Sequence, residues 1–208
     1  MRRHPLIAAI GHKRVGKDTF ADVLVNRYGY TRVAFADPLK DAALALNPYV
    51  GPTPLPGALA SEFRRLQDVV AALGWEKAKD VVPGVRETLQ RLGTDAIRAL
   101  DDTFWVRAGV KAIEAIDGPV VVTDARFPNE GDTVRALGGY IVRIERALPD
   151  DGDRHPSETA LDDYMADFCI FNDGPVEDLQ AHARYIADHV ESVESYRTWS
   201  GALAAPAL

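Results

Sequence analysis

Five short apolar runs along the chain predict buried β-strands. They lie at residues 6–10, 31–36, 120–124, 140–145 and 168–171. Between these runs, apolar residues recur every three or four positions, which is typical of amphipathic helices. The alternation predicts an α/β three-layer sandwich, with a five-stranded, mostly parallel sheet and helices on both faces. Cys169 lies inside the last apolar run, and we therefore expect a buried thiol.

The segment between the second and third runs is long and mainly helical. Apolar stripes predict helices at 61–73 and 85–100, whereas residues 47–57 hold four prolines and two glycines and predict a loop. We expect residues of about 37–117 to form a helical insert at the carboxyl edge of the sheet, where open α/β sheets bind ligands. Asp37 would lie at that edge, or would only cap the helix that follows it.

A glycine-framed loop follows the first strand. Its sequence is Gly11-x-x-x-x-Gly16-Lys17, and a helical pattern begins directly after it. Strand, loop, lysine and helix together are typical of a phosphate-binding loop, or P-loop, in which backbone N–H groups surround phosphate oxygens. Lys17 is expected to bridge the outer phosphates, and Lys13 lies in the same loop. The alternative is an ordinary strand-to-helix turn with a surface lysine.

The residue after the P-loop lysine departs from the common pattern. Asp18 stands where a serine or threonine usually contacts Mg²⁺, and Thr19 follows it. A carboxylate could serve as well, because Mg²⁺ prefers oxygen ligands, or Asp18 could simply favour the positive end of the helix. Asp124, at the end of the third strand, is the kind of carboxylate that P-loop enzymes use to bind Mg²⁺ directly or through water.

Polar residues in the insert are candidates for a second ligand. Arg86, Gln90 and Thr94 fall on one face of the predicted helix at 85–100, and together they could hold a phosphate and the polar edge of a base. A solvated helix face is the alternative. Asp95 could join this set, or could only pair with Arg91 four residues before it.

Composition narrows the class of protein. The 208 residues carry a formal net charge of −7 and a pI of about 5.2, which argues against a protein that coats nucleic acid. One cysteine allows no internal disulfide. No apolar run approaches the roughly 20 residues that span a bilayer. We therefore expect a cytoplasmic protein of one domain, without a membrane partner or stable nucleic-acid binding.

Taken in order, five motifs resemble the phage-type deoxynucleoside monophosphate kinases. They are Gly16-Lys17-Asp18-Thr19, Phe35-Ala36-Asp37-Pro38-Leu39-Lys40, Leu89-Gln90-x-Leu92-Gly93-Thr94-Asp95, Thr123-Asp124-Ala125-Arg126-Phe127-Pro128-Asn129-Glu130 and His155-x-Ser157-Glu158. The resemblance extends over about residues 6–190. An aspartate after the P-loop lysine agrees with this family, and it also occurs in relatives of phosphomevalonate kinase.

The resemblance implies a P-loop kinase that transfers the γ-phosphoryl group of ATP to a (deoxy)nucleoside monophosphate with Mg²⁺. In that enzyme, Lys17, Asp18, Arg86 and Arg126 would act in catalysis. The ATP side would comprise Gly11, Lys13, Gly16, Lys17, Asp18, Thr19, Arg143, Arg146 and Arg154, and Mg²⁺ would be held by Asp18, Thr19 and Asp124. The acceptor side would comprise Phe35, Asp37, Lys40, Arg86, Gln90, Thr94, Asp95 and Arg126. A region of about 143–160 would close as a lid.

Two other functions remain open from the sequence. A kinase for phosphomevalonate or dephospho-coenzyme A would share the ATP site and differ in the acceptor pocket. A nucleotide-dependent switch or motor is the second alternative, but the chain has neither the Asn-Lys-x-Asp string of GTPases nor an Asp-x-x-Gly segment after Asp124. For the kinase, the expected partners are two small-molecule substrates, with a homodimer left open, in the host cytoplasm if a phage encodes the chain.

Overall fold

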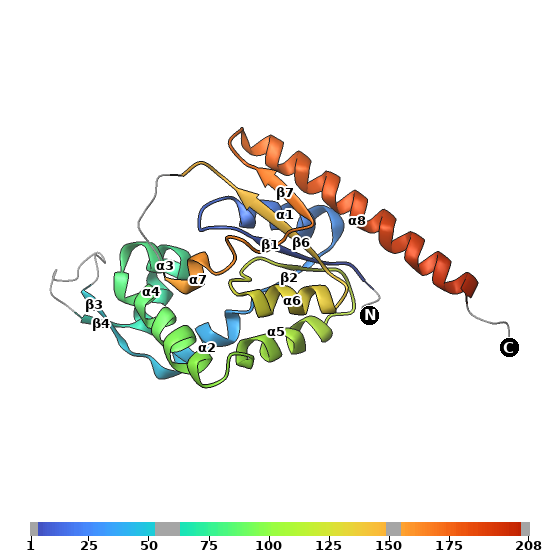
Figure 1. Ribbon diagram of the computed structural model, residues 1–208. Coiled ribbons are helices and arrows are strands. Elements are labelled where there is room, and N and C mark those ends of the chain that lie inside the picture. The colour runs from blue at the N-terminus through green and yellow to red at the C-terminus, as the bar shows by residue number, and fades with distance from the viewer. Residues whose placement is uncertain (1–3, 53–62, 149–154, 205–208) are drawn as a thin grey trace. The chain divides into compact units, whose positions relative to one another are not determined.

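The computed structural model describes residues 4–52, 63–148 and 155–204 (Figure 1). The chain divides into two compact units. The first unit runs to Ala34 and resumes at Gly109, and the second unit is the continuous segment Phe35–Ala108. The second unit thus interrupts the first, and the helical insert of about residues 37–117 stays a prediction.

A parallel sheet forms the centre of the first unit. Its strands are β1 (Leu6–Ile10), β2 (Thr31–Val33), β5 (Val120–Val122), β6 (Tyr140–Glu145) and β7 (Phe168–Phe171). They lie in the order β2-β5-β1-β6-β7, and every pairing is parallel. All of β1 is buried, as expected for a central strand covered on both faces. The five predicted strands are therefore confirmed.

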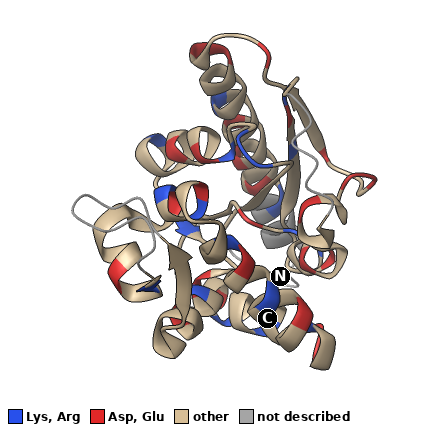
Figure 2. Cartoon of the chain, turned by 90° about the vertical axis from the view of Figure 1, so that its left-hand side faces the viewer, with Lys and Arg blue, Asp and Glu red and all other residues tan. Residues whose placement is uncertain are grey.

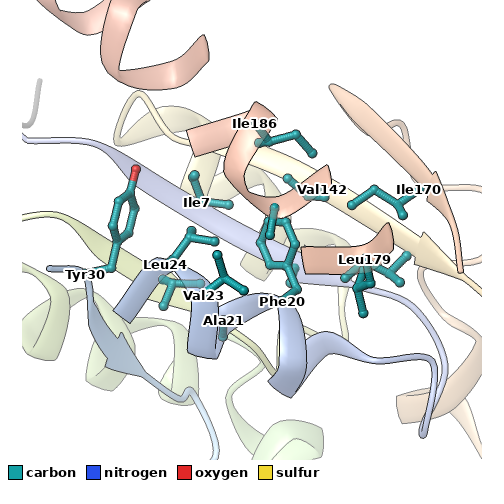
Figure 3. Close-up of a cluster of buried hydrophobic side chains, with 14 of the residues drawn as sticks. Ile7, Phe20, Ala21, Val23, Leu24, Tyr30, Val142, Ile170, Leu179 and Ile186 are labelled. Atoms are coloured by element: carbon teal, nitrogen blue, oxygen red, sulfur yellow. The ribbon is translucent and has the colours of Figure 1, made fainter. Parts of the chain in front are cut away.

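Helices cover both faces of this sheet. The covering helices are α1 (Lys17–Tyr28), α6 (Pro128–Ala136) and α8 (Val176–Ala204). The first unit also contains the short α7 (Pro156–Thr159), and the residues of α5 (Phe104–Glu114) are divided between the two units. Helices α1 and α8 pack together on one face, where Phe20, Leu24, Leu179 and Ile186 surround Ile7 (Figure 3). Helix α6 packs against β1 and β6 on the other face (Figure 1).

The edge strand β7 corrects one expectation. Ile170 is buried, but Cys169 and Phe171 on either side of it are exposed. Successive side chains of a strand point to opposite faces, and an edge strand is covered less completely than a central one. The prediction of a buried thiol at Cys169 was therefore wrong.

The second unit is mainly helical and has its own core. Its elements are α2 (Asp37–Leu46), β3 (Tyr49–Pro52), β4 (Phe63–Arg65), α3 (Leu66–Val81), α4 (Pro83–Gln90) and the π-helix η1 (Arg91–Arg98). The core is formed by apolar residues of these elements, chiefly Val50, Leu66, Val69, Val82 and Val85. Figure 2 shows both acidic and basic residues on the helices of the chain.

Local structure in the second unit departs from the sequence predictions at three places. Residues 49–52 of the predicted loop at 47–57 form β3, which pairs antiparallel with β4, and residues 53–57 lie outside the described residues. The helix expected from residue 61 begins at Leu66 instead. The helix expected over 85–100 becomes a π-helix after Gln90. Asp37 starts α2 without capping it, and accepts a hydrogen bond from Lys40 Nζ at 2.9 Å.

Candidate active site

Close packing explains why the P-loop needs glycine at both ends. Gly11 and Gly16 have φ angles of 132° and 109°, which side chains rarely adopt. A Cβ atom at Gly11 would lie 2.2 Å from the carbonyl oxygen of Ile144, and one at Gly16 would lie 2.8 Å from Nδ2 of Asn172. The loop between β1 and α1 is therefore pressed against the ends of β6 and β7.

Lys17, in the first turn of α1, folds back over this loop. Its Nζ donates hydrogen bonds to the carbonyl oxygens of Gly11 and His12, at 2.7 and 2.6 Å. Burial and, secondarily, the nearby positive charge of Arg126 lower the pKa of Lys17 from 10.5 to about 8. Three carboxylates act in the opposite direction on this pKa, namely Glu158, Asp18 and Asp124. The lysine is thus the centre of a cluster of charges.

Arg126 is held firmly at both its side chain and its backbone. Its Nη1 donates to Oε2 of Glu158 at 2.9 Å, and the Glu158 side chain is only 6% exposed. The buried carboxylate of Glu130 accepts hydrogen bonds from the backbone N–H groups of Arg126 and Phe127, at 2.6 and 3.2 Å. The guanidinium therefore lies in a fixed position beside the phosphate loop.

A small pocket lies at this point. Its lining comes from the P-loop, the segment after β5, β6 and the segment around α7, and comprises Gly11, Ala125, Arg126, Arg143, Ser157, Glu158, Leu161 and Asp162. Glu158 was not among the predicted site residues, although it closes the last of the five motifs. Only its place in that motif could have indicated it, because nothing in its own surroundings along the chain marks it.

The segment that carries Glu158 is tied to the sheet by further bonds. Nε2 of His12 pairs with Asp162 at 2.9 Å. Nη2 of Arg143 donates to the carbonyl oxygens of Leu161 and Tyr164, at 2.7 and 2.5 Å. The guanidinium of Arg143, which was expected to bind ATP, thus bonds in this structure to the segment that directly follows the predicted lid.

The other two arginines of the predicted lid are Arg146 and Arg154. Arg146 is exposed beyond the end of β6. Arg154 lies outside the described residues.

The predicted Mg²⁺ ligands lie at the carboxyl edge of the sheet and in α1. Arg32 on β2 pairs with Asp18, and its Nε donates a hydrogen bond to Oγ1 of Thr123 at 3.1 Å. Thr123 is the residue directly before Asp124 in the sequence. Thr19 lies in the first turn of α1. Arg32 was not a predicted site residue, because a lone arginine in a short strand gives no spacing signal.

The chemistry of these ligands fits Mg²⁺. The carboxylates and hydroxyl of Asp18, Thr19 and Asp124 are hard oxygen donors of the kind Mg²⁺ selects. Within the described part of the chain, no group of three or more His, Cys, Asp or Glu could hold a metal alone.

The predicted acceptor residues other than Arg126 all lie in the second unit. Phe35 is buried, Asp37 pairs with Lys40 in α2, and Gln90 ends α4. Arg86 Nη2 lies 3.8 Å from a carboxylate oxygen of Asp80, which leaves the pair loosely held. Arg91 pairs with Glu87, the residue four positions before it.

Thr94 and Asp95 lie in the π-helix η1, in which Gly93 packs against Leu39 of α2. A Cβ atom at Gly93 would lie 2.6 Å from Cδ2 of Leu39, so that a larger residue there would require the Leu39 side chain to move. The carbonyl oxygen of Gly93 accepts a buried hydrogen bond from Nε1 of Trp105 at 2.9 Å. Short π-helices are rare in proteins, and those that do occur are often found at functional sites. Because Gly93 of η1 packs against Leu39 of α2, helix η1 lies beside the residues Asp37 and Lys40 of α2.

A parallel sheet with a glycine-framed loop and lysine between its central strand and the next helix defines a P-loop protein of the nucleotide-binding class. The sequence profile of deoxynucleotide monophosphate kinase matches residues 61–183, which is more than half of the chain. The chain belongs to the deoxynucleotide monophosphate kinase family, and it is an enzyme of the kinase class.

Individual relatives agree with this family. A protein of Acanthamoeba polyphaga mimivirus, provisionally named deoxynucleotide monophosphate kinase, is 28% identical over 210 residues, covering 90% of this chain and 98% of the relative. The deoxynucleotide monophosphate kinase of Enterobacteria phage T4 is 26% identical over 230 residues, covering 84% of this chain and 95% of the relative.

Similarity to solved structures is weaker. Dephospho-CoA kinase from Campylobacter jejuni aligns with 91% of this chain and 98% of its own, at 18% identity and a TM-score of 0.42, which is too low to bear on function. No helix among the described residues has both the length and the apolar character needed to cross a membrane.

Proposed function

We propose that this protein transfers the γ-phosphoryl group of ATP to a deoxynucleoside monophosphate, with Mg²⁺, to give ADP and a deoxynucleoside diphosphate. An oxygen of the acceptor phosphate forms a bond to the γ-phosphorus as the bond from that phosphorus to the β-phosphate oxygen breaks. The electron pair of the broken bond leaves with ADP. The acceptor phosphate is already anionic, and no general base is required.

The observation that carries this proposal is the cluster of Lys17, Arg126 and Glu158 beside the phosphate loop. Phosphoryl transfer depends mainly on positioning and on charges that stabilise the transferring group. Lys17 would exchange its two carbonyl partners for phosphate oxygens of ATP. Arg126, held beside the loop by Glu158 and Glu130, would stabilise the group in transfer.

Mg²⁺, when bound, would neutralise charge on the β- and γ-phosphates and orient them. Asp18, Thr19 and Asp124 would hold it, directly or through water. Arg32 would keep the Asp18 carboxylate near Asp124 by bonding Asp18 and Thr123 at once. The part of the predicted lid that follows β6, which ends at Glu145, would exclude water from the reaction.

The second unit supplies the acceptor residues in this proposal. Arg86 would clamp the phosphate of the acceptor, since its ion pair with Asp80 is long and readily exchanged. The base or sugar would be bound by Gln90, which directly precedes the π-helix, and by Thr94 and Asp95, which lie within it. Asp37 and Lys40 would complete the site from α2, beside the buried Phe35.

A coupled assay of ADP release tests the function. It would use ATP, Mg²⁺, each deoxy- and ribonucleoside monophosphate in turn, and a blank without acceptor. Release that depends on one or more deoxynucleoside monophosphates supports the proposal and identifies the base. Release equal to the blank with every nucleotide, together with turnover of phosphomevalonate or dephospho-coenzyme A, would replace it with another kinase activity. Steady release in the blank alone would indicate a hydrolase that drives a partner.

A further inference from the structure

Three buried polar side chains of the described residues lie near the candidate site, namely Thr123, Glu130 and Asn172. Thr123 holds Arg32, and Glu130 holds the backbone of Arg126. Asn172 follows the edge strand β7 and belongs to none of the sequence motifs. Burying a side-chain amide costs free energy unless hydrogen bonds within the protein replace those that the amide made with water.

We propose that Asn172 is a positioning residue that orients the phosphate loop for ATP. Its Nδ2 donates a buried hydrogen bond to the carbonyl oxygen of Val15, inside the loop, at 2.8 Å. This bond joins residues 157 positions apart in the sequence. The inference rests on the proposed use of ATP, but not on the identity of the acceptor.

The geometry of one peptide group connects this bond to the phosphates. The carbonyl of Val15 and the N–H of Gly16 belong to the same peptide, and the described residues contain no cis peptide bond. In a planar trans peptide, the C=O and N–H bonds point in opposite directions. Because Asn172 holds the carbonyl oxygen on its own side, the N–H of Gly16 points away from Asn172. That N–H is one of the donors by which a P-loop binds phosphate.

Asn172 is itself held in place before any ligand arrives. Its backbone N–H donates to the carbonyl oxygen of Glu145 at 2.7 Å, at the end of β6. The next residue, Asp173, accepts a hydrogen bond from the backbone N–H of Ala147 at 2.8 Å. The side-chain amide of Asn172 also lies so close to Gly16 that a Cβ atom on Gly16 would lie 2.8 Å from Nδ2 of Asn172. The loop and its support are therefore fitted to each other.

The test is the affinity of three variants for MgATP, measured by calorimetry on the whole protein. Asn172→Asp keeps the shape but turns a carboxylate oxygen toward the carbonyl of Val15, and we expect affinity to fall about tenfold or more. Asn172→Ser, which is shorter and uncharged, should give a smaller fall and decides the matter if the aspartate variant does not fold. Asp173→Asn, which keeps an acceptor for Ala147, is the matched control and should bind as the wild type does.

A merely structural role predicts a different result. In that case the melting temperature of the Asn172 variants would fall, while the MgATP affinity of the folded protein would stay within about twofold of the wild type. That result would overturn the proposal, as would an equal loss of affinity for MgATP and for the acceptor. Calorimetry with ATP needs no acceptor. A wild type that binds MgATP but phosphorylates no deoxynucleoside monophosphate would therefore refute the proposed function and leave this inference standing.

Discussion

The two units of this protein hold their candidate residues in different ways. In the first unit, side chains bond to backbone far away in the sequence, as Asn172 does to Val15 and Arg143 to Leu161. In the second unit, the ion pairs of Lys40 and Arg86 are with residues three and six positions away. Exposed local ion pairs are worth about 0–1 kcal/mol, so they are easily exchanged for a ligand. In the proposed function, the candidate residues of the first unit would therefore keep one geometry, whereas Lys40 and Arg86 of the second unit would exchange their partners for a ligand.

The largest effect should come from the centre of the first unit. In Lys17→Met, the positive charge that would stabilise the transferring group is lost, and we expect kcat to fall by about 10²–10³-fold or more. Steady-state ADP release measures this. Lys111→Met, at an exposed position of α5, is the control and should be fully active. A Lys17 variant within about tenfold of the wild type would remove the lysine from the mechanism.

The next test separates the two units. Arg86→Ala should raise the KM for the acceptor by about tenfold to a hundredfold, since a hydrogen bond to a charged group contributes about 1.5–3 kcal/mol. The KM for ATP should not change. Arg91→Ala, one turn further and paired with Glu87, should leave both constants alone. If Arg86→Ala raised the KM for ATP instead, the division of roles between the units would be wrong.

The pH dependence of ATP binding should follow Lys17. Its lowered pKa of about 8 means that the free enzyme loses this charge as the pH rises through 8, whereas phosphate oxygens favour the charged form. Affinity for ATP should therefore fall by about tenfold between pH 7 and pH 9, and binding at pH 9 should take up protons.

Calorimetry in buffers of different ionisation enthalpy measures that proton uptake. Lys17→Arg stays charged throughout this range and should show no uptake linked to residue 17. Uptake that persisted unchanged in this variant would assign the titration to another group.

The smallest effect should come from the support of the π-helix. Trp105→Phe keeps an aromatic side chain but removes the indole N–H that donates to the carbonyl oxygen of Gly93, and such a bond contributes about 1 kcal/mol. We expect the KM for the acceptor to rise roughly fivefold, with no change in the KM for ATP. Phe104→Leu, at the partly exposed neighbouring position, is the control. Equal changes in both KM values would show a general loss of structure.

The same contrast explains what could be predicted from the sequence. Buried parallel strands are continuous apolar runs, and the P-loop glycines have no substitutes, so the sheet and the loop were both evident. In the second unit, helical spacing could not reveal that the helix becomes a π-helix, because contacts of Gly93 with Leu39 and Trp105 accompany that change. The pairing of β3 with β4 likewise depends on tertiary packing.

Three single residues escaped prediction for physical reasons. Glu158 and Arg32 act through partners distant in the sequence, Arg126 and Asp18, which no local pattern shows. Cys169 was misplaced because periodicity does not distinguish an edge strand from a central one. The site roles given to residues of both units remain predictions until the variants above are measured.

The order of strands has a consequence for how the protein is made. Strand β1 leaves the ribosome first, yet its two neighbours, β5 and β6, are synthesised only after the whole second unit. The second unit is continuous and has its own core, and it could fold while β1 and β2 wait for the strand that lies between them. Pairings so distant in the sequence form slowly and leave apolar strands exposed to aggregation. A chain that stops short of Val120 would therefore carry a buried-type strand with nothing to pair with.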